Sequence, residues 1–323
     1  MQGWRTTMED THVAVPSLLH HSHDLSLFAC FDGHGGKFSA NFARNKFLSV
    51  LRETEEFKKF EKLEYEDRDV RENGIELLRL ALHECFLALD AKLLFDGTTK
   101  TTCSVGRDVS GCTALAIIVT PKFILCANAG DSRAVLTKVD NDGFLDRLEK
   151  KAQDHKDENE NGTEEKNKEP TSTGDEPKYL AIPLSHDHRP TSSSEKERIL
   201  KAGGHIIKNR ISGDIAVSRG LGDFRYKKNL APSEQIVTCI PEISIHKRSD
   251  DADQFVVMGC DGIWDIHAKK DIIGQIVVDL SMDGKDVAYA CEEVSLFLII
   301  FLSFLFSHYI LMLSDIRLMF KKG

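Results

Sequence analysis

The chain has 323 residues, which is enough for one large domain or two small ones. Hydrophobic residues make up 41% of it and charged residues 29%, an ordinary balance for a globular protein. Its net charge of −9 argues against nucleic acid as the main partner, because a phosphate backbone is bound by a basic surface.

Cysteine usage and the first residues indicate the compartment. The 8 cysteines form no Cys-x-x-Cys pair and no Cys/His cluster with zinc spacing. Several lie in apolar, strand-like runs such as Phe28–Phe31, so we expect buried free thiols in a reducing compartment. The start, Met1–Arg5, is polar and shows no secretory signal. These features predict a cytoplasmic or nuclear protein.

The first part of the chain alternates a short apolar strand with helices. Leu25–Phe31 is apolar and stops at an Asp-Gly-His-Gly-Gly run, which predicts a buried strand followed by a turn. Phe38–Leu51 and Ile75–Leu94 carry apolar residues at helical spacing, so two amphipathic helices are expected there.

The pattern in the middle of the chain predicts a hairpin and, after it, a polar insertion. Ala114–Val119 and Phe123–Cys126 are apolar strands on either side of a Thr-Pro-Lys turn, and Ala134–Leu136 resumes the strand pattern. Residues 140–178 are then rich in Asp, Glu, Lys and Asn. Such a stretch cannot bury enough apolar surface to order itself, which predicts an acidic, low-complexity, solvated insertion within one domain.

One helix and one strand are expected after the insertion. Ser192 followed by Glu195 predicts a helix that opens with a capping box, and Gly203-Gly204 predicts its end. Phe255–Cys260 is a further buried strand, which ends at an Asp-Gly pair. Strands and helices mixed in this way indicate the α+β class.

Acidic residues follow three of the expected strands, at Asp32, Asp131 and Asp261. Carboxylates that converge at one edge of a sheet repel one another unless a cation neutralises them. Mg²⁺ and Mn²⁺ are hard divalent ions that prefer oxygen ligands. The pattern therefore favours a metal site of carboxylates.

Each feature alone has an ordinary explanation. An Asp-Gly pair after a strand is commonly a turn. The pair Glu9 and Asp10 could be solvated, His34 could be a loop residue, and Arg5 could be a surface cation. The case for a site depends on all of them occurring together.

Seven motifs in order resemble the type 2C (PPM) family of metal-dependent protein serine/threonine phosphatases, and the resemblance runs from Gly3 to about Glu293. They are Gly3-Trp4-Arg5 with Met8-Glu9-Asp10; Phe31-Asp32-Gly33-His34-Gly35-Gly36; Ser110-Gly111-Cys112-Thr113-Ala114; Asn128-Ala129-Gly130-Asp131-Ser132-Arg133; Leu184-Ser185-His186-Asp187-His188-Arg189-Pro190; Ala216-Val217-Ser218-Arg219-Gly220-Leu221-Gly222-Asp223; and Cys260-Asp261-Gly262-Ile263-Trp264-Asp265.

The resemblance implies a four-layer α-β-β-α sandwich, in which helices flank two mainly antiparallel sheets. It also implies two Mg²⁺ or Mn²⁺ ions and a weaker third. By position, Asp32 resembles the carboxylate that bridges the two ions. At the first ion, Gly33 would bind through its carbonyl and Glu9 through a water, with Asp10 beside them. Asp261 would bind the second ion, and Asp131 together with Asp261 would bind the third.

The implied activity is hydrolysis of phosphoserine and phosphothreonine in proteins by a metal-activated water, as in signal transduction. By the same resemblance, Arg5 would bind the substrate phosphate, since a guanidinium offers a planar donor fork. His34 would protonate the leaving alkoxide. Partners would be phosphorylated proteins and not nucleic acid, and the chain is expected to be a monomer.

The sequence departs from the family pattern at both ends of the catalytic domain, residues 1–293. Family members usually have a strand before the first motif, so by the resemblance we expect an edge strand to be missing here. The family also closes with an Asp-Asn motif, whose Asp binds metal, and a final strand, but no Asp-Asn pair follows Asp261.

Residues 294–313 are instead almost wholly apolar and precede a short basic tail, 314–323. The apolar segment could be a transmembrane helix, since about 20 apolar residues cross a bilayer. It could also be a buried helix in place of lost core, or a gene-model artefact that translates non-coding sequence.

Two rival functions follow from these departures. A pseudophosphatase would keep the fold with a degraded metal site, and the absent C-terminal ligand favours it. A membrane-anchored binding protein would use residues 294–313. The intact Arg5, Asp32, His34 and Asp261 favour the enzyme.

Overall fold

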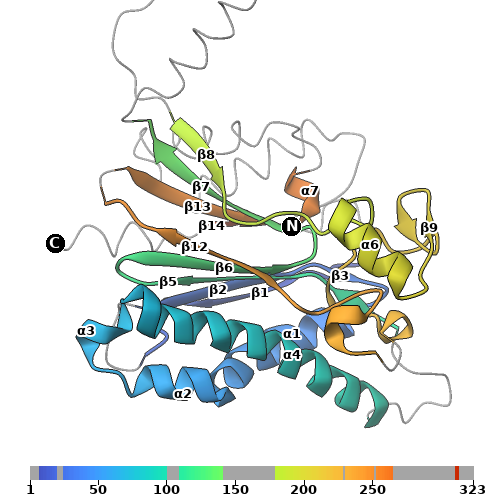
Figure 1. Ribbon diagram of the computed structural model, residues 1–323, viewed down its shortest axis with the longest axis horizontal. Coiled ribbons are helices and arrows are strands. Elements are labelled where there is room, and N and C mark those ends of the chain that lie inside the picture. The colour runs from blue at the N-terminus through green and yellow to red at the C-terminus, as the bar shows by residue number, and fades with distance from the viewer. Residues whose placement is uncertain are drawn as a thin grey trace, which may run out of the picture.

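Two antiparallel sheets pack face to face in the computed structural model of the chain, and helices cover the outer face of the first sheet (Figure 1). The described residues are 7–19, 25–99, 109–140, 179–227, 230–250, 252–264 and 310–312.

The first sheet is the centre of the molecule and has the strand order β1-β2-β5-β6-β12. All its neighbouring strands are antiparallel. Every residue of β2, β5 and β6 is buried, which agrees with apolar runs that are continuous rather than alternating. The bounds are β1 Thr11–Val15, β2 Ser26–Phe31, β5 Ala114–Val119, β6 Phe123–Ala129 and β12 Glu242–Lys247.

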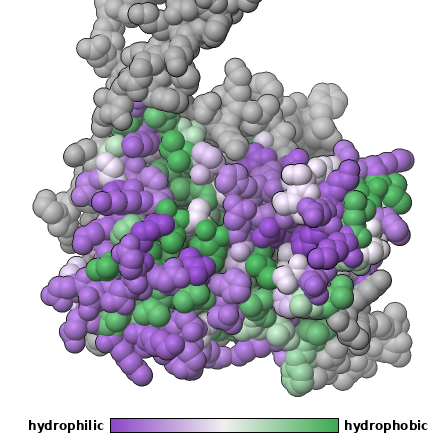
Figure 2. Space-filling view, in the orientation of Figure 1, coloured by the Kyte–Doolittle hydropathy of each residue, from purple (hydrophilic) through white to green (hydrophobic). Residues whose placement is uncertain are grey.

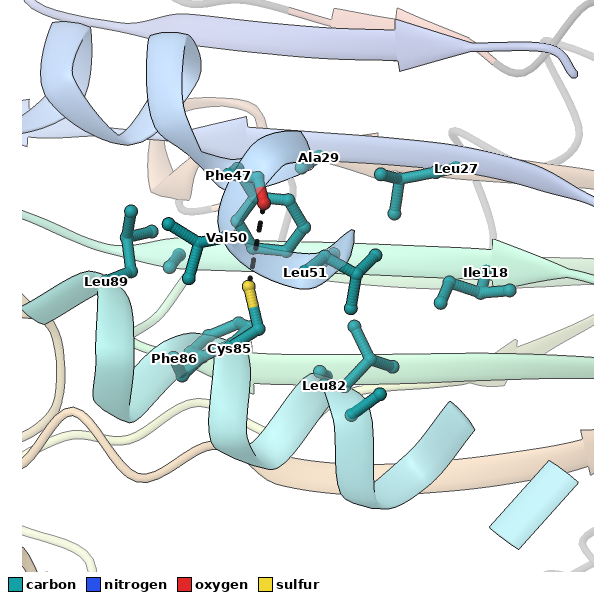
Figure 3. Close-up of a cluster of buried hydrophobic side chains, with 14 of the residues drawn as sticks. Leu27, Ala29, Phe47, Val50, Leu51, Leu82, Cys85, Phe86, Leu89 and Ile118 are labelled. Carbon is teal, nitrogen blue, oxygen red and sulfur yellow. Dashed lines mark hydrogen bonds between the residues drawn. The ribbon is translucent and has the colours of Figure 1, made fainter. Parts of the chain in front are cut away.

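Helices cover one face of this sheet and bury its alternate side chains. Leu27 and Ala29 of β2 pack in a hydrophobic core with Phe47 of α1 and Leu82 of α4. Figure 3 shows this core, in which the Cys85 thiol donates a hydrogen bond to the Phe47 carbonyl at 3.7 Å. The helical elements are α1 Phe38–Glu53, α2 Glu55–Glu61, α3 Tyr65–Arg68, the π-helical turn η1 Arg71–Ile75, and α4 Glu76–Thr99.

The other face of the first sheet packs against the second sheet, whose order is β14-β13-β7-β8. Phe28, which alternates with Leu27 and Ala29 along β2, joins a separate core with Leu136 of β7 and Met258 of β13. Successive strand residues point to opposite faces, so one strand supplies both cores. The bounds are β7 Arg133–Val139, β8 Tyr179–Pro183, β13 Asp253–Gly259 and β14 Ile310–Met312.

Smaller elements gather at the end of the sheets opposite α3 (Figure 1). Three two-residue strands make a small sheet in the order β11-β4-β3, and β9 pairs with β10 in a hairpin. Most of the surface over α2 and α3 is hydrophilic in Figure 2, whereas a hydrophobic patch lies at β9, where Ile207 is 53% exposed. The bounds are β3 Gly33–His34, β4 Gly111–Cys112, α6 Ser193–Lys201, β9 Ile206–Ile207, β10 Arg210–Ile211, β11 Leu221–Gly222, η2 Phe224–Tyr226, η3 Pro232–Glu234 and α7 Asp261–Trp264.

The strands and helices expected from hydrophobic patterns are confirmed, but the capping box is wrong. Helix α6 begins where the pattern placed it, yet the Ser192 side chain makes no capping hydrogen bond. The carboxylate of Glu195 accepts hydrogen bonds from Arg198, Arg219 and Ser218 instead. Two guanidinium groups are stronger partners for a carboxylate than one backbone amide.

Thiol burial agrees with the expectation from the sequence. The free cysteines within the described part of the chain are all buried: Cys30, Cys85, Cys112, Cys126, Cys239 and Cys260. Burial raises the pKa of the Cys85 thiol, which keeps it protonated and unreactive. Cys103 and Cys291 lie outside the described residues.

The described residues include only part of the outer layers and of the C-terminal segment. The helices over the first sheet, the first sheet and the second sheet form three layers. The fourth layer, of helices over the second sheet, stays a prediction. Of the apolar segment 294–313, Ile310–Met312 form β14, which pairs with Val257–Gly259 of β13. Among the described helices, none is both long and apolar enough to cross a bilayer. The three readings of residues 294–313 therefore stay predictions.

The ends of strands β7 and β8 predict that residues 140–178 can be removed. Val139 and Tyr179 are paired across the antiparallel ladder, so the chain leaves and re-enters the sheet at the same point. Replacing residues 140–178 with Asn-Gly should close a two-residue hairpin without straining either strand. We expect the melting temperature to stay within about 3 °C, since long surface loops change stability little. A loss of more than about 8 °C in a thermal melt would show that the insertion packs on the domain.

Candidate metal centre

Three aspartates meet where strands of both sheets end. Asp32 follows β2, Asp131 follows β6, and Asp261 starts α7 one residue after the end of β13. A carboxylate oxygen of Asp32, one of Asp261 and the Cys260 sulfur all lie within 4.8 Å of one another. The predicted convergence of Asp32 and Asp261 is therefore present in the structure.

The ladder between β1 and β2 adds the acidic pair that precedes β1. Thr11 pairs with Phe31, so the same register places Asp10 opposite Asp32 and Glu9 opposite Gly33. Residues directly opposite on an antiparallel pair project from the same face. The Asp10 side chain accordingly lies close enough to Asp32 to raise its pKa. A Cβ on Gly33 would lie 2.4 Å from the Glu9 carbonyl oxygen, so only glycine fits at this close approach.

Mutual repulsion is strong within this cluster. Burial, followed by the charges of Asp10, Asp261 and Asp131, raises the pKa of Asp32 well above its ordinary value. Burial and the charge of Asp261 raise the pKa of Asp131 to about 7, against a lowering by Arg189. The native fold thus holds carboxylates in positions that are unfavourable unless positive charge is supplied.

The donor set fits a hard divalent cation. Asp10, Asp32 and Asp261 offer carboxylate oxygens, and the Glu9 backbone lies against Gly33, the residue next to Asp32. Oxygen ligands of this kind are those that Mg²⁺ and Mn²⁺ prefer. The one sulfur, Cys260, is 2% exposed, and its thiol donates a hydrogen bond to Asp10 at 3.7 Å.

Hydrogen bonds from Thr113 hold the loops that carry two of the aspartates. Its backbone N–H donates to the Asp32 carbonyl at 2.9 Å. Its hydroxyl accepts from the Asp32 N–H at 3.2 Å and shares a hydrogen bond of 2.8 Å with Ser132. The loops after β2 and β6 are therefore fixed relative to each other, which is what a preformed metal site needs.

His34 lies next to the acidic cluster and is bound by a second, buried aspartate. Its Nε2 atom is 2.7 Å from Oδ2 of Asp223. The His34 side chain is 34% exposed, whereas that of Asp223 is fully buried. Burial lowers the pKa of His34, but the hydrogen bond and charge of Asp223 outweigh it, so the net pKa is raised.

The small three-stranded sheet explains why these two residues meet. In register, Gly33, Cys112 and Leu221 lie side by side, and so do His34, Gly111 and Gly222. Asp223 follows Gly222 directly and therefore reaches His34 across β4. The glycines at these positions leave room for the contact, as a Cβ on Gly111 would lie 2.0 Å from Asp223 Oδ2.

The described part of the chain brings together most of the residues that the sequence indicated. Asp10, Asp32, Asp131 and Asp261 interact electrostatically in one cluster. Glu9 and Gly33 are adjacent to it, and the charge of Glu9 acts on His34. Arg5 lies outside the described residues, so its phosphate-binding role stays a prediction.

Sequence reasoning missed Asp223 and underestimated Cys260. The motif that ends in Gly222-Asp223 was noted, but nothing in it says that the aspartate reaches His34, far away in the sequence. The sequence placed Cys260 only at the end of a buried strand, but its sulfur lies within 4.8 Å of the Asp32 and Asp261 oxygens. The only signal was its position directly before Asp261.

The sequence matches the family model "Protein phosphatase 2C" over residues 1–164 and 173–299. It is 35% identical to "Protein phosphatase 2C homolog 2" of Saccharomyces cerevisiae, over 88% of this chain and 49% of that protein. It is 33% identical to "Protein phosphatase ppm-1.A" of Caenorhabditis elegans, over 91% of this chain and 53% of that protein. The chain belongs to the protein phosphatase 2C family.

Comparison with solved structures supports the fold. The crystal structure of serine-threonine phosphatase 2C from Toxoplasma gondii matches with a TM-score of 0.70 and 16% identity, covering 92% of this chain and 86% of that one. The chain spans about half the length of the curated relatives named above.

Proposed function

We propose that this chain hydrolyses phosphoserine and phosphothreonine in proteins, with Mg²⁺ or Mn²⁺ bound at the acidic cluster. The observation that carries the proposal is the convergence of four mutually repelling carboxylates beside a partly exposed histidine. Membership in the protein phosphatase 2C family supports the substrate class.

The residues divide into a set for the cations and a set for the substrate. Asp32, with Asp10 and Asp261 beside it, would hold two ions, with Glu9 and Gly33 at the first. Asp131 and Asp261 would hold a weaker third. Bound divalent ions supply a Lewis acid that polarises a phosphoryl oxygen and lowers the pKa of water.

His34 and Arg5 would handle the substrate itself. A serine or threonine alkoxide is a poor leaving group, so a proton donor at His34 would accelerate its departure, typically by ~10²–10⁴-fold. Arg5 precedes the Glu9-Asp10 pair and would bind the phosphate oxygens through its guanidinium fork. The buried thiols supply no nucleophile in this proposal, because burial raises the pKa of Cys30.

A metal titration tests the proposed function. The full chain is assayed on a phosphothreonine peptide with increasing Mn²⁺ or Mg²⁺, and then with excess EDTA. We expect turnover that depends on the metal and disappears in EDTA. Because no Asp-Asn pair follows Asp261, we expect one ion to bind more weakly and activity to need raised Mn²⁺. Turnover in EDTA would refute metal dependence, while metal binding with no turnover at any concentration would favour the pseudophosphatase.

A further inference from the structure

We propose that Asp223 is the positioning residue for His34, holding the ring so that Nδ1 faces the substrate and delivers the proton to the leaving oxygen. This inference rests on the function proposed above. It adds a residue to which the sequence analysis gave no role, and it names the His34 nitrogen that acts.

The first support is the geometry of the contact. Asp223 Oδ2 lies 2.7 Å from Nε2 of His34, a short distance for a hydrogen bond between a ring nitrogen and a carboxylate. An ionised carboxylate can only accept, so it assigns a proton to Nε2. Nδ1 is then the remaining ring nitrogen for a substrate, and the His34 side chain is 34% exposed.

The second support is that Asp223 makes this contact from a backbone conformation and a buried position that lower stability. Asp223 has a φ of 52°, in the left-handed region that non-glycine residues seldom adopt. Its Oδ1 atom is buried with no hydrogen-bond partner among the described protein atoms. A buried acceptor left unpaired lowers the stability of the fold. Features that lower stability in this way concentrate where a side chain serves function.

The third support is that the side chain of Asp223 is not needed for the local backbone. Its N–H donates to the Ser110 carbonyl at 3.1 Å, and its own carbonyl accepts from the Tyr226 N–H at 2.9 Å. Asparagine tolerates the same left-handed φ. Asp223→Asn should therefore keep the turn and change only the partner that faces His34.

The proton balance of the step is simple. In the doubly protonated ring, Nε2 keeps its proton and donates it in the hydrogen bond to Asp223. As a water oxygen forms a bond to phosphorus, the phosphorus–oxygen bond to serine or threonine breaks, and the Nδ1–H bond breaks with it. The leaving oxygen takes the proton and departs as a neutral alcohol, and His34 is left as neutral imidazole. The Asp223 carboxylate accepts the Nε2–H hydrogen bond throughout and stabilises the cationic ring before transfer.

The kinetic test compares two leaving groups in the full chain. A phosphothreonine peptide needs a proton at its leaving oxygen, whereas p-nitrophenyl phosphate releases a stable phenolate that does not. Asp223→Asn should lower kcat on the peptide ~10–100-fold, with KM within about twofold, and lower kcat on the aryl phosphate less than about threefold. His34→Asn should show the same selective loss, and the double variant should be no slower than His34→Asn.

Controls separate the structural and functional failures. Asp214 is exposed and pairs with Arg225 at 2.5 Å, so Asp214→Asn should leave both substrates unaffected. If His34→Asn slows both substrates equally, the proton-donor role of His34 fails and the proposed function must change. Two other outcomes would overturn only this inference and show that Asp223 is merely structural. In one, His34→Asn is selective for the peptide but Asp223→Asn slows both substrates equally. In the other, the losses of the two single variants multiply in the double variant.

A spectroscopic readout keeps the inference testable in a chain without turnover. Ring nitrogen shifts of His34 in the metal-free protein, assigned by their loss in His34→Asn, report which nitrogen carries the proton. We expect Nε2–H in the neutral ring of the wild type and a shift of population toward Nδ1–H in Asp223→Asn, whose amide can donate to Nε2. A neutral ring already protonated on Nδ1 in the wild type would overturn the proposal.

Discussion

Asp32→Asn will lower phosphopeptide turnover at least ~100-fold, because it removes the central negative charge of the cluster. Asp32 interacts with Asp10, Asp261 and Asp131 at once. Losing several kcal/mol of charge stabilisation corresponds to this factor or more in rate. Calorimetric titration should show weaker Mn²⁺ binding in the same variant.

In the metal-free protein, Asp32→Asn should instead be favourable and raise the thermal stability. Asp32 is held next to other carboxylates that raise its pKa, so its ionised form is unfavourable at neutral pH. The neutral amide relieves this repulsion, and the melting temperature should rise by ~2–4 °C for each kcal/mol removed. Asp67→Asn on α3 makes the same chemical change at an exposed position and should alter neither the Mn²⁺ affinity nor the melting temperature. Unchanged Mn²⁺ affinity in Asp32→Asn would show that the ions bind elsewhere.

The part of the site that lies along one strand or at its end could be predicted from the sequence. Asp32 and Asp261 follow buried apolar runs, and the strand period fixes where such residues emerge. The contact between Asp10 and Asp32 depends on the register of β1 with β2, and the short β1 was not predicted. Register is set by pairing across the sheet, and no local pattern reveals it.

The contact between His34 and Asp223 was harder to foresee because it crosses a sheet of three two-residue strands. Strands that short carry no periodicity, and each contains one glycine that permits close approach. The two large cores, by contrast, follow from apolar runs such as those of β2 and β5, which are long enough to show that both faces are buried. The fold was therefore more predictable than the detail of the site.

Glu195→Ala is expected to destabilise the protein by ~3–5 kcal/mol, because it removes a buried carboxylate and leaves two partly buried arginine charges without their counterion. Its carboxylate accepts from Arg219 at 2.7 Å, Arg198 at 2.5 Å and Ser218 at 2.6 Å. Arg219 and Arg198 also donate to the carbonyls of Ile240 and Ile236. The side chain thus ties α6 to the segment that leads into β11 and Asp223.

The pH dependence of this effect identifies its cause. Burial raises the pKa of Glu195, but the hydrogen bonds of Arg219 and Ser218 and the arginine charges outweigh it and lower the pKa to about 2 from 4.5. A depressed pKa means that the ionised form stabilises the fold. Its contribution is complete above about pH 4.5 and is lost as the pH falls toward about 2. The difference in unfolding free energy between wild type and Glu195→Ala should therefore be constant at neutral pH and shrink below that range.

Urea denaturation at a series of pH values measures that difference. Glu55→Ala, which removes an exposed carboxylate paired with Lys58, is the matched control and should change stability little at any pH. A Glu195→Ala difference that stayed the same down to pH 3 would mean that lost packing, and not the ion pairs, causes it. Because Glu195 lies outside the acidic cluster, the surviving folded fraction should bind Mn²⁺ as the wild type does, so a parallel loss of metal affinity would instead place this network in the metal centre.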